Sequence, residues 1–255
     1  MRLVSSIGRA WALTYVTLAI VLLGAVALAA TAVAMTYLGP FDGWFVVGAL
    51  TPYAVVGAII VIRIGGSHPY PRFGAANVVT LIRLILTCLF AGLAFQATTQ
   101  DTIIADGVAW LFLVVAVLAL VLDGVDGYFA RKQGLSSRFG SRFDMETDAL
   151  QILLLSITAL ALGKVGLWVM IGGLLRYIYV AAGWAWPALT QPLRPSWRRK
   201  IISVVQGGVL TALLAPIIGP PLSVILAGVA LVLLVYSFAQ DVVWLARGPV
   251  PGHFY

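Results

Sequence analysis

The stretch of sequence that decides the fold reads Asp123-Gly-Val-Asp126-Gly127-Tyr-Phe-Ala130-Arg131 and, eight residues later, Gly140-Ser-Arg-Phe-Asp144-Met-Glu-Thr-Asp148. Its four aspartates lie at the ends of two apolar segments, in a chain that has only 9 acidic residues. Carboxylates at a membrane boundary are costly unless a cation pairs with them. Their hard oxygen atoms suit Mg²⁺ or Mn²⁺, and such an ion in turn suggests a phosphate-containing substrate.

The aspartates form two pairs with helical spacing. The first two are three residues apart and the last two are four residues apart, so each pair shares one face of a helix. We therefore expect the carboxylates of two helices to converge across a short loop. Gly124 and Gly127 would let a ligand approach the backbone closely, and Gly140 would relax the loop before the second helix.

A plainer interpretation of this acidic cluster is that it pairs with Arg131, Arg138 and Arg142 in a solvated loop. That interpretation gives no reason for the fixed spacing or for the glycines beside the acids. Glu146 lies between the last two aspartates and should point away from them on a helix. It is either a solvated or arginine-paired side chain or a support for the ligands from behind.

The composition excludes a soluble globular protein. The chain is 62% hydrophobic and 10% charged, which indicates an all-α, polytopic integral membrane protein. The net charge of +7 does not indicate a nucleic-acid partner, because the basic residues lie in short loops between apolar runs. The single cysteine, Cys88, cannot form an intramolecular disulfide, and the two histidines give little basis for a histidine metal site.

A span of ~20 apolar residues is needed to cross the bilayer, and the chain has about eight such segments. Glycine and proline separate them. The expected helices are 10–37, 44–64, 76–98, 106–131, 145–163, 166–187, 200–218 and 222–245.

The distribution of lysine and arginine predicts the orientation. With a cytoplasmic N-terminus, only Lys164 falls in a loop on the opposite side, so both termini and the aspartates should be cytoplasmic. The expected location is the cell (inner or plasma) membrane. The basic residues expected on the cytoplasmic side are Arg2, Arg9, Arg63, Arg72, Arg131, Lys132, Arg138, Arg142, Arg194, Arg198, Arg199, Lys200 and Arg247.

The spacing D-x2-D-G-x2-A-R-x8-G-x3-D-x3-D resembles, at every position, the signature of the CDP-alcohol phosphotransferase family, also called CDP-alcohol phosphatidyltransferases. These are integral membrane enzymes that make phospholipid head groups. The resemblance implies a six-helix catalytic core at about 72–247, preceded by two extra helices in 1–71 and followed by a cytoplasmic tail, 248–255. Because every motif begins at or after Asn77, we expect residues 1–71 to be separable from the chemistry.

The resemblance also implies roles for the residues of the motif. Asp123, Asp126 and Asp144 would bind Mg²⁺ or Mn²⁺, with two ions expected, and Asp148 would be both near the metal and the general base. The residues that would line the CDP part of the donor, or lie near its phosphates, are Gly127, Ala130, Arg131 and Gly140.

Residues 77–83, Asn77-Val-Val-Thr80-Leu-Ile-Arg83, look like the N-x2-T-x2-R start of the first core helix in many family members. Asn77 and Thr80 are accordingly assigned to nucleotide binding. Asn77 has the alternative role of a helix N-cap. Arg83 either contacts substrate phosphate or extends to the membrane interface.

Three further residues are candidates for the acceptor or a phosphate. Lys200 and Ser203 belong to a segment resembling the family's K-x2-T-x2-Q helix start, although Lys200 also fits a cytoplasmic basic cluster. Arg176 lies within an apolar span, where an arginine marks a functional site or pairs with an acid or carbonyl. Some relatives that use glycerol phosphate have Arg-Glu in this helix, whereas Tyr177 follows here, so that acceptor is not implied.

The reaction expected from the resemblance is transfer of a phosphatidyl group from CDP-diacylglycerol to an alcohol, with release of CMP. The alternative within the family is a CDP-linked small alcohol as donor and diacylglycerol as acceptor. An alternative from another class is a cation-coupled transporter, which predicts acids near the midplane and broken helices. The resemblance also implies a homodimer, since relatives often form one.

Overall fold

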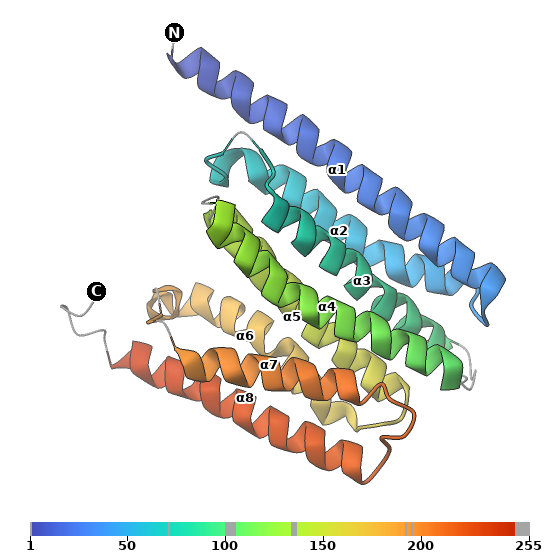
Figure 1. Cartoon of the computed structure of the whole chain (residues 1–255). Coiled ribbons are helices and arrows are strands. Elements are labelled where there is room, and N and C mark those ends of the chain that lie inside the picture. The colour runs from blue at the N-terminus through green and yellow to red at the C-terminus, as the bar shows by residue number, and fades with distance from the viewer. Residues whose placement is uncertain are drawn as a thin grey trace.

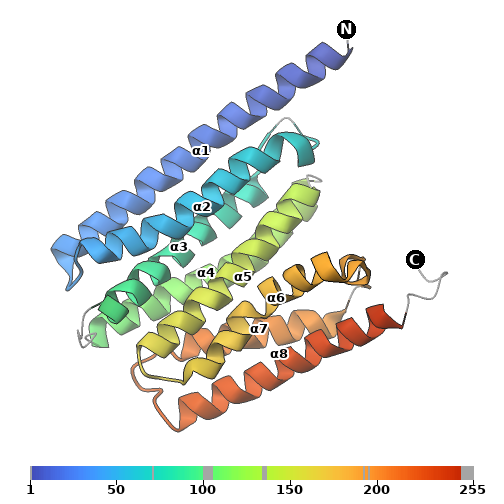
Figure 2. The same cartoon turned by 180° about the vertical axis from the view of Figure 1, so that it is seen from behind.

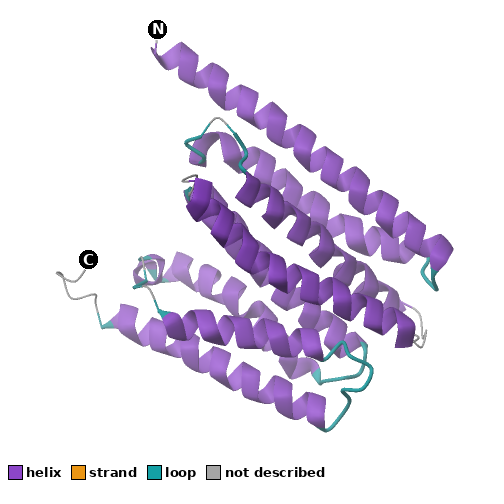
Figure 3. Ribbon diagram, in the orientation of Figure 1, coloured by secondary structure: helices purple, strands orange, loops and turns teal. Residues whose placement is uncertain are grey.

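The computed structural model describes residues 2–70, 72–99, 106–133, 137–191, 193–194 and 196–247, without the side chains of 2–10, 66–67, 99 and 125–133. Within these ranges the chain forms α-helices and two short 3-10 helices, with no strand (Figure 3). The prediction of an all-α fold is confirmed. The helices are α1 (Arg2–Leu38), α2 (Gly43–Ser67), α3 (Ala75–Thr99), α4 (Asp106–Gln133), α5 (Arg138–Ala161), η1 (Leu167–Val169), α6 (Met170–Ala185), η2 (Pro187–Thr190), α7 (Trp197–Ala212) and α8 (Leu222–Ala246).

The long helices lie side by side, with α1 at one edge of the bundle and α8 at the other (Figures 1 and 2). The start of α1 and the end of α8 lie at one end of this bundle, and so do the end of α4 and the start of α5. Six helices in the described ranges are long and apolar enough to cross a membrane, which confirms a polytopic membrane protein. They are α1, α2, α3, α4, the segment formed by η1 and α6, and α8.

Helix α5 is the polar helix in the middle of the bundle. It packs against α3, α6 and α7, and it buries Thr147, Gln151, Ser156 and Thr158. Buried hydroxyl groups need partners, and Thr158 donates to the Leu154 carbonyl oxygen at 2.8 Å. Because protein rather than lipid surrounds α5, the helix tolerates the polar residues that a lipid-facing span would exclude.

The bounds of three predicted helices were wrong. The first helix begins at Arg2 rather than at 10. The fifth helix begins at Arg138 rather than at 145, because the Ser137 hydroxyl accepts a hydrogen bond from the Gly140 amide and caps the first turn. Gly140 therefore lies inside a helix and does not relax a loop. The seventh helix runs from Trp197 to Ala212 rather than 200–218, and turns continue the chain toward α8.

Close glycine contacts fix α2 on α3. A Cβ atom built on Gly92 would lie 2.7 Å from the Phe45 carbonyl oxygen, and one on Gly48 would lie 2.7 Å from the Phe95 Cβ. Small residues let two helix backbones approach in a membrane, where packing rather than water drives association. The two helices therefore pack backbone against backbone at these two points.

Helix α1 is attached to the same unit. The hydroxyl of Tyr53 in α2 donates to the Val21 carbonyl oxygen of α1 at 2.9 Å, and Tyr53 is only 2% exposed. Gly24 and Gly57 leave the space that this contact between α1 and α2 requires. The first two helices are thus packed elements of the bundle.

Lys164 joins two loops at the other end of the bundle. Its Nζ donates to the carbonyl oxygens of Ala215, Pro216 and Ile218, at 3.2, 3.4 and 2.7 Å. The Lys164 carbonyl oxygen in turn accepts a hydrogen bond from Ser223. The one basic loop residue expected on that side is therefore used to bind carbonyl groups at the end of α7.

Candidate active site

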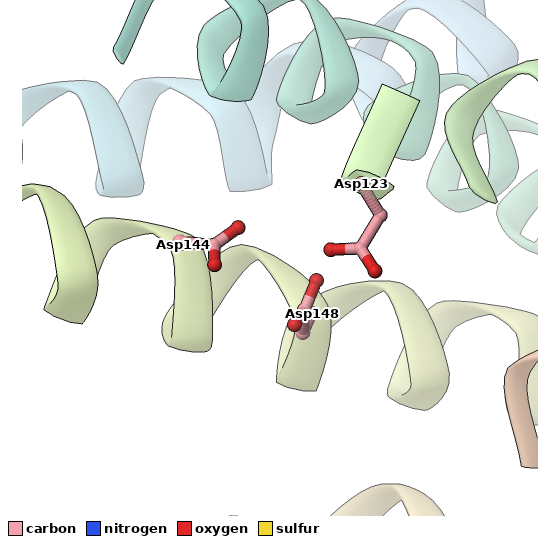
Figure 4. Close-up of side chains that lie close together, drawn as sticks. All are labelled: Asp123, Asp144 and Asp148. Carbon is pink, nitrogen blue, oxygen red and sulfur yellow. The ribbon is translucent and has the colours of Figure 1, made fainter. Parts of the chain in front are cut away.

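Three of the four motif aspartates converge at the end of the bundle where α4 ends and α5 begins. Asp144 and Asp148 lie one turn apart on α5, and Asp123 faces them from α4 (Figure 4). One carboxylate oxygen from each of the three lies within 4.8 Å of the other two. The spacing argument for a shared helical face and for convergence of the two helices is confirmed for these residues.

Arg83 of α3 joins the three carboxylates. Its Nη1 lies 2.7 Å from Asp144 Oδ1 and its Nη2 lies 2.9 Å from Asp123 Oδ1, and Nη2 also donates to Asp148. The arginine side chain is 1% exposed, whereas the aspartate side chains are 33–38% exposed. Arg83 therefore does not extend to the membrane interface, and that alternative is wrong. The guanidinium offsets part of the electrostatic repulsion among the three carboxylates. A divalent ion at the same place would also reduce this repulsion.

The geometry fits a divalent metal site. Oxygen ligands ~2.1 Å from Mg²⁺ can be at most ~4.2 Å apart, so carboxylates within 4.8 Å need close only slightly to share one ion. All three donors are carboxylates on helices, which suits Mg²⁺ or Mn²⁺ rather than a softer metal. The described residues that would hold it are Asp123, Asp144 and Asp148.

Part of the predicted site lies outside the described side chains. Asp126, Gly127, Ala130 and Arg131 belong to this group, so their assignments to metal and nucleotide stay predictions. Among the described residues, a Cβ built on Gly124 would meet no atom within 4 Å apart from its own helix backbone and chain neighbours. This agrees with the expectation that a ligand can approach the backbone here.

Of the three arginines considered as solvated partners of the aspartates, Arg131 has a side chain outside the described ones. Arg138 and Arg142 are exposed on the first turns of α5, whereas the three carboxylates bind Arg83. The described partner of these acids is instead a buried arginine from another helix. A solvated loop cluster does not account for that arrangement.

Asn77 and Gly140 bring the starts of α3 and α5 together. A Cβ built on Gly140 would lie 2.9 Å from Asn77 Oδ1, so glycine is what allows the approach. Asn77 is not an N-cap, because α3 begins at Ala75. The side-chain amide of Asn77 instead donates a hydrogen bond from Nδ2 to the Phe73 carbonyl oxygen. Thr80 donates to the Ala76 carbonyl oxygen at 3.1 Å and is buried.

Two residues that the sequence reasoning missed hold the first turn of α5. Ser137 Oγ accepts a hydrogen bond from the Gly140 amide at 3.0 Å, and His68 Nδ1 lies 2.9 Å from the same oxygen. A serine three residues before the motif glycine is a signal for the cap. The histidine is distant in sequence, and no local pattern indicates it.

Arg176 has an acidic partner. Its Nη2 donates to Glu146 Oε1 at 2.6 Å, with 28% of the arginine and 49% of the glutamate side chain exposed. Of the two interpretations of Glu146, the arginine-paired one is observed. The pair lies on the face of α5 toward α6, behind the aspartates.

The two candidates on α7 do not join the cluster. Lys200 is exposed, with its Nζ 5.6 Å from the centre of the Trp197 ring, and Ser203 is exposed too. Among the described residues, neither side chain makes a hydrogen bond or ion pair to the aspartates. The neighbouring Arg198 and Arg199 bind Asp241 of α8, at 2.7 and 3.3 Å, which is an ion pair between helices that the sequence reasoning also missed.

This arrangement suits chemistry on an anionic phosphate group. Carboxylates from two helices can hold a divalent cation, and a buried guanidinium next to them can donate hydrogen bonds to phosphate oxygens. A single carboxylate that the cation does not fully neutralise can accept a proton. These capacities occur together at one end of a membrane bundle.

A comparison with protein-family models covers the residues of this site. The family model described as CDP-alcohol phosphatidyltransferase matches residues 73–236, which is more than half of the chain and includes the three aspartates and Arg83. No curated protein and no solved structure matches the chain.

Proposed function

The chain belongs to the CDP-alcohol phosphatidyltransferase family, and on that premise we propose that it transfers a phosphatidyl group from CDP-diacylglycerol to an alcohol, with release of CMP. The observation that carries the proposal is the convergence of Asp123, Asp144 and Asp148 within 4.8 Å, in the spacing of the family signature. Membership supports a transfer from a CDP-linked alcohol, and the donor and acceptor named here go beyond it.

In the proposed reaction, the acceptor hydroxyl oxygen forms a bond to the phosphorus that carries diacylglycerol. The bond from that phosphorus to the bridging oxygen breaks, and CMP leaves with the electron pair. Asp148 takes the hydroxyl proton, as a carboxylate within reach of the reacting oxygen can. Two Mg²⁺ or Mn²⁺ ions would polarise the pyrophosphate when bound. Asp123, Asp126, Asp144 and Asp148 would hold them.

Arg83 is proposed to exchange partners in this cycle. Its guanidinium binds the carboxylates of Asp144 and Asp123 at 2.7 and 2.9 Å. A divalent ion on the same oxygens would weaken those contacts and leave the guanidinium available to a phosphate oxygen. A planar guanidinium can donate two parallel hydrogen bonds to phosphate, which suits it for this role.

The roles of the remaining candidate residues are proposed from their positions in the sequence motifs. We propose that the nucleotide lies at the starts of α3 and α5, where Asn77 and Gly140 approach, with the residues that the motif adds from the end of α4. The nucleotide residues are Asn77, Thr80, Gly127, Ala130, Arg131 and Gly140. Arg176, Lys200 and Ser203 are proposed to act on the acceptor side.

CDP-diacylglycerol is favoured as donor because the site lies at the end of membrane-spanning helices. Its lipid tails can enter from the bilayer while the nucleotide stays at the polar end of the bundle. The second candidate has a CDP-linked small alcohol as donor and diacylglycerol as acceptor. A cation-coupled transporter is disfavoured by Asp123, which lies at the end of the apolar segment Asp106–Gly124 rather than at its middle.

We further propose that the site and both termini face the cytoplasm of a cell membrane, that residues 72–247 form the catalytic core, and that the protein forms a homodimer. The tail at 248–255 lies outside the described residues.

The test is release of CMP by the purified protein, measured with CDP-diacylglycerol and a panel of alcohols, with Mg²⁺, with Mn²⁺ and with a chelator. Serine, glycerol phosphate, inositol phosphate, choline and water form the panel. Metal-dependent CMP release that requires one alcohol supports the proposal. Turnover of a CDP-linked small alcohol with diacylglycerol would support the second candidate, and no turnover with either donor would overturn both.

A further inference from the structure

We propose that His68, which precedes the residues matched to the family, is a positioning residue that fixes the first turn of α5 and thereby the carboxylates of Asp144 and Asp148. The inference rests on the proposed function, because the placement of α5 affects the reaction only if these aspartates take part in it. It also gives the first two helices a role in the site, where the sequence had suggested that they are separable.

The position of His68 is set by α2. Its backbone amide donates to the Ile64 carbonyl oxygen at 3.1 Å and ends that helix, and the residue is 8% exposed. Helix α2 is itself held on α3 by the close contacts at Gly48 and Gly92. The imidazole ring is therefore presented from the end of a helix that packs closely on α3.

The hydrogen bonds of the ring define its role. Its Nε2 lies 2.8 Å from the Arg72 carbonyl oxygen, and since a carbonyl only accepts, Nε2 carries a proton. In the neutral ring Nδ1 then accepts from the Ser137 hydroxyl, 2.9 Å away. The same serine oxygen accepts from the Gly140 amide at 3.0 Å. A continuous chain of hydrogen bonds thus runs from the end of α2 to the first turn of α5.

The ring also packs on that turn. It lies edge-on to Phe139, with the ring centres 5.8 Å apart, and Phe139 is 5% exposed. Edge-to-face contacts between rings at this distance are favourable. His68 therefore holds both the capping serine and the second residue of the helix.

A small shift at the start of α5 would move the aspartate side chains of the site. Gly140 lies against Asn77, because a Cβ built on Gly140 would be only 2.9 Å from Asn77 Oδ1. Asp144 follows one helical turn later. If the cap is lost, the first turn can unwind or rotate, and the carboxylates of Asp144 and Asp148 move relative to Asp123. A displacement of about 1 Å in a catalytic group can lower the rate by ~100-fold.

The experiment compares five full-length variants with the wild type, one of them a control. His68→Phe keeps the shape of the ring but removes its hydrogen bonds, and Ser137→Ala removes the cap. The double variant tests whether they act as one unit, and His68→Gln restores one donor and one acceptor. Asp42→Ala is the control, because Asp42 caps α2 through the Trp44 amide at the far end of the bundle.

Two readouts are used. Hydrogen exchange of the peptide spanning 137–145 reports the first turn of α5 without requiring turnover. Metal-dependent CMP release gives kcat and the KM for the donor, normalised to folded protein. If the wild type releases no CMP with any donor, the proposed function fails, and the exchange measurement still tests the link from His68 to α5.

We expect His68→Phe and Ser137→Ala each to speed exchange of the Gly140 amide and to lower kcat/KM by about tenfold to 100-fold. The double variant should be no worse than either single one, and His68→Gln should recover most of the loss. Asp42→Ala should lower Tm and leave turnover per folded molecule unchanged. Unchanged exchange in His68→Phe, multiplying effects in the double variant, or an equal kinetic loss in Asp42→Ala would overturn the proposal. If His68→Phe does not fold, Ser137→Ala and His68→Gln decide by the same measures.

Discussion

Arg83 Nη1 lies 2.7 Å from Asp144 Oδ1, and the arginine side chain is only 1% exposed. The other terminal nitrogen of the same guanidinium lies 2.9 Å from Asp123 Oδ1. A buried arginine therefore binds the carboxylates that the family signature assigns to metal. An arginine and a metal ion at this site would compete for the same negative charge, and such competition can be measured without substrate.

Replacing Arg83 with glutamine should destabilise the metal-free protein, because three acids then lose their buried cation. Removing one partner of a fully buried ion pair costs roughly 3–5 kcal/mol, and the loss here should be smaller because the aspartates are 33–38% exposed. Mg²⁺ or Mn²⁺ should recover more of the stability in the variant than in the wild type, since no arginine competes with the ion. The measurement is thermal unfolding in detergent, with a chelator and with each metal.

Arg142→Gln is the matched control, because Arg142 is exposed on α5. It should change neither Tm nor the shift caused by metal. An equal metal-induced shift in Arg83→Gln and the wild type would contradict competition between the arginine and the ion.

Asp123→Asn and Asp144→Asn should each abolish metal-dependent CMP release while the protein still folds. Each change removes a negatively charged ligand and keeps the size of the side chain. Both variants should also lose the metal-induced rise in Tm. Asp106→Asn, at an exposed position in the first turn of α4, should behave as the wild type. Full activity in either motif variant would exclude a shared metal site.

Local spacing predicted those parts of the site that lie on one or two neighbouring helices. Asp144 and Asp148 are four residues apart, and helical periodicity alone places them on one face. The start of α5 at Arg138 was missed because polar residues there hide the helix from a hydropathy argument, although Ser137 is a recognisable cap.

Long-range partners could not be read from the sequence. Arg83 and Asp144 are 61 residues apart, and His68 and Ser137 are 69 apart, so only the packing of α2, α3 and α5 brings them together. Nothing in the local pattern distinguishes Arg83 from an arginine that extends to the interface. The sequence likewise did not identify the partner of Arg176, because the position of Glu146 is equally compatible with a solvent-exposed side chain.

Lys164→Met should destabilise the protein without changing its chemistry. The variant leaves the carbonyl oxygens of Ala215, Pro216 and Ile218 without the charged donor that binds them. Hydrogen bonds to a charged group contribute about 1.5–3 kcal/mol, so Tm should fall measurably. Turnover per folded molecule should not change. Arg247→Met, at an exposed position, provides the comparison, and an equal fall in Tm there would deny Lys164 its role.

The two ends of the bundle should be accessible from opposite sides of the membrane. In a Cys88→Ala background, Arg138→Cys and Thr98→Cys introduce exposed cysteines at the start of α5 and near the end of α3. On the basic-residue distribution, an impermeant maleimide should label Thr98→Cys in intact cells, and Arg138→Cys only after permeabilisation. The reverse pattern would place the aspartates on the outer side.

Variants of the ion pair between Arg176 and Glu146 can distinguish an acceptor-binding role from a purely structural contact. Arg176 Nη2 lies 2.6 Å from Glu146 Oε1. If Arg176 also holds the acceptor, Arg176→Ala should raise the KM for the acceptor more than that for the donor, because it removes ground-state binding. Arg176→Lys should recover only part, since a planar fork becomes a point charge.

Glu146→Gln is the matched variant for this test, because it breaks the ion pair and keeps the arginine. It should leave the acceptor KM near the wild-type value, or lower it by freeing the guanidinium for a phosphate or carboxylate on the acceptor. A structural pair predicts a different pattern. Arg176→Ala and Glu146→Gln would then lower Tm alike, leave both KM values unchanged, and regain stability in the exchanged variant with Arg176→Glu and Glu146→Arg. That result would favour a neutral alcohol as acceptor, because the arginine would then be committed to its carboxylate.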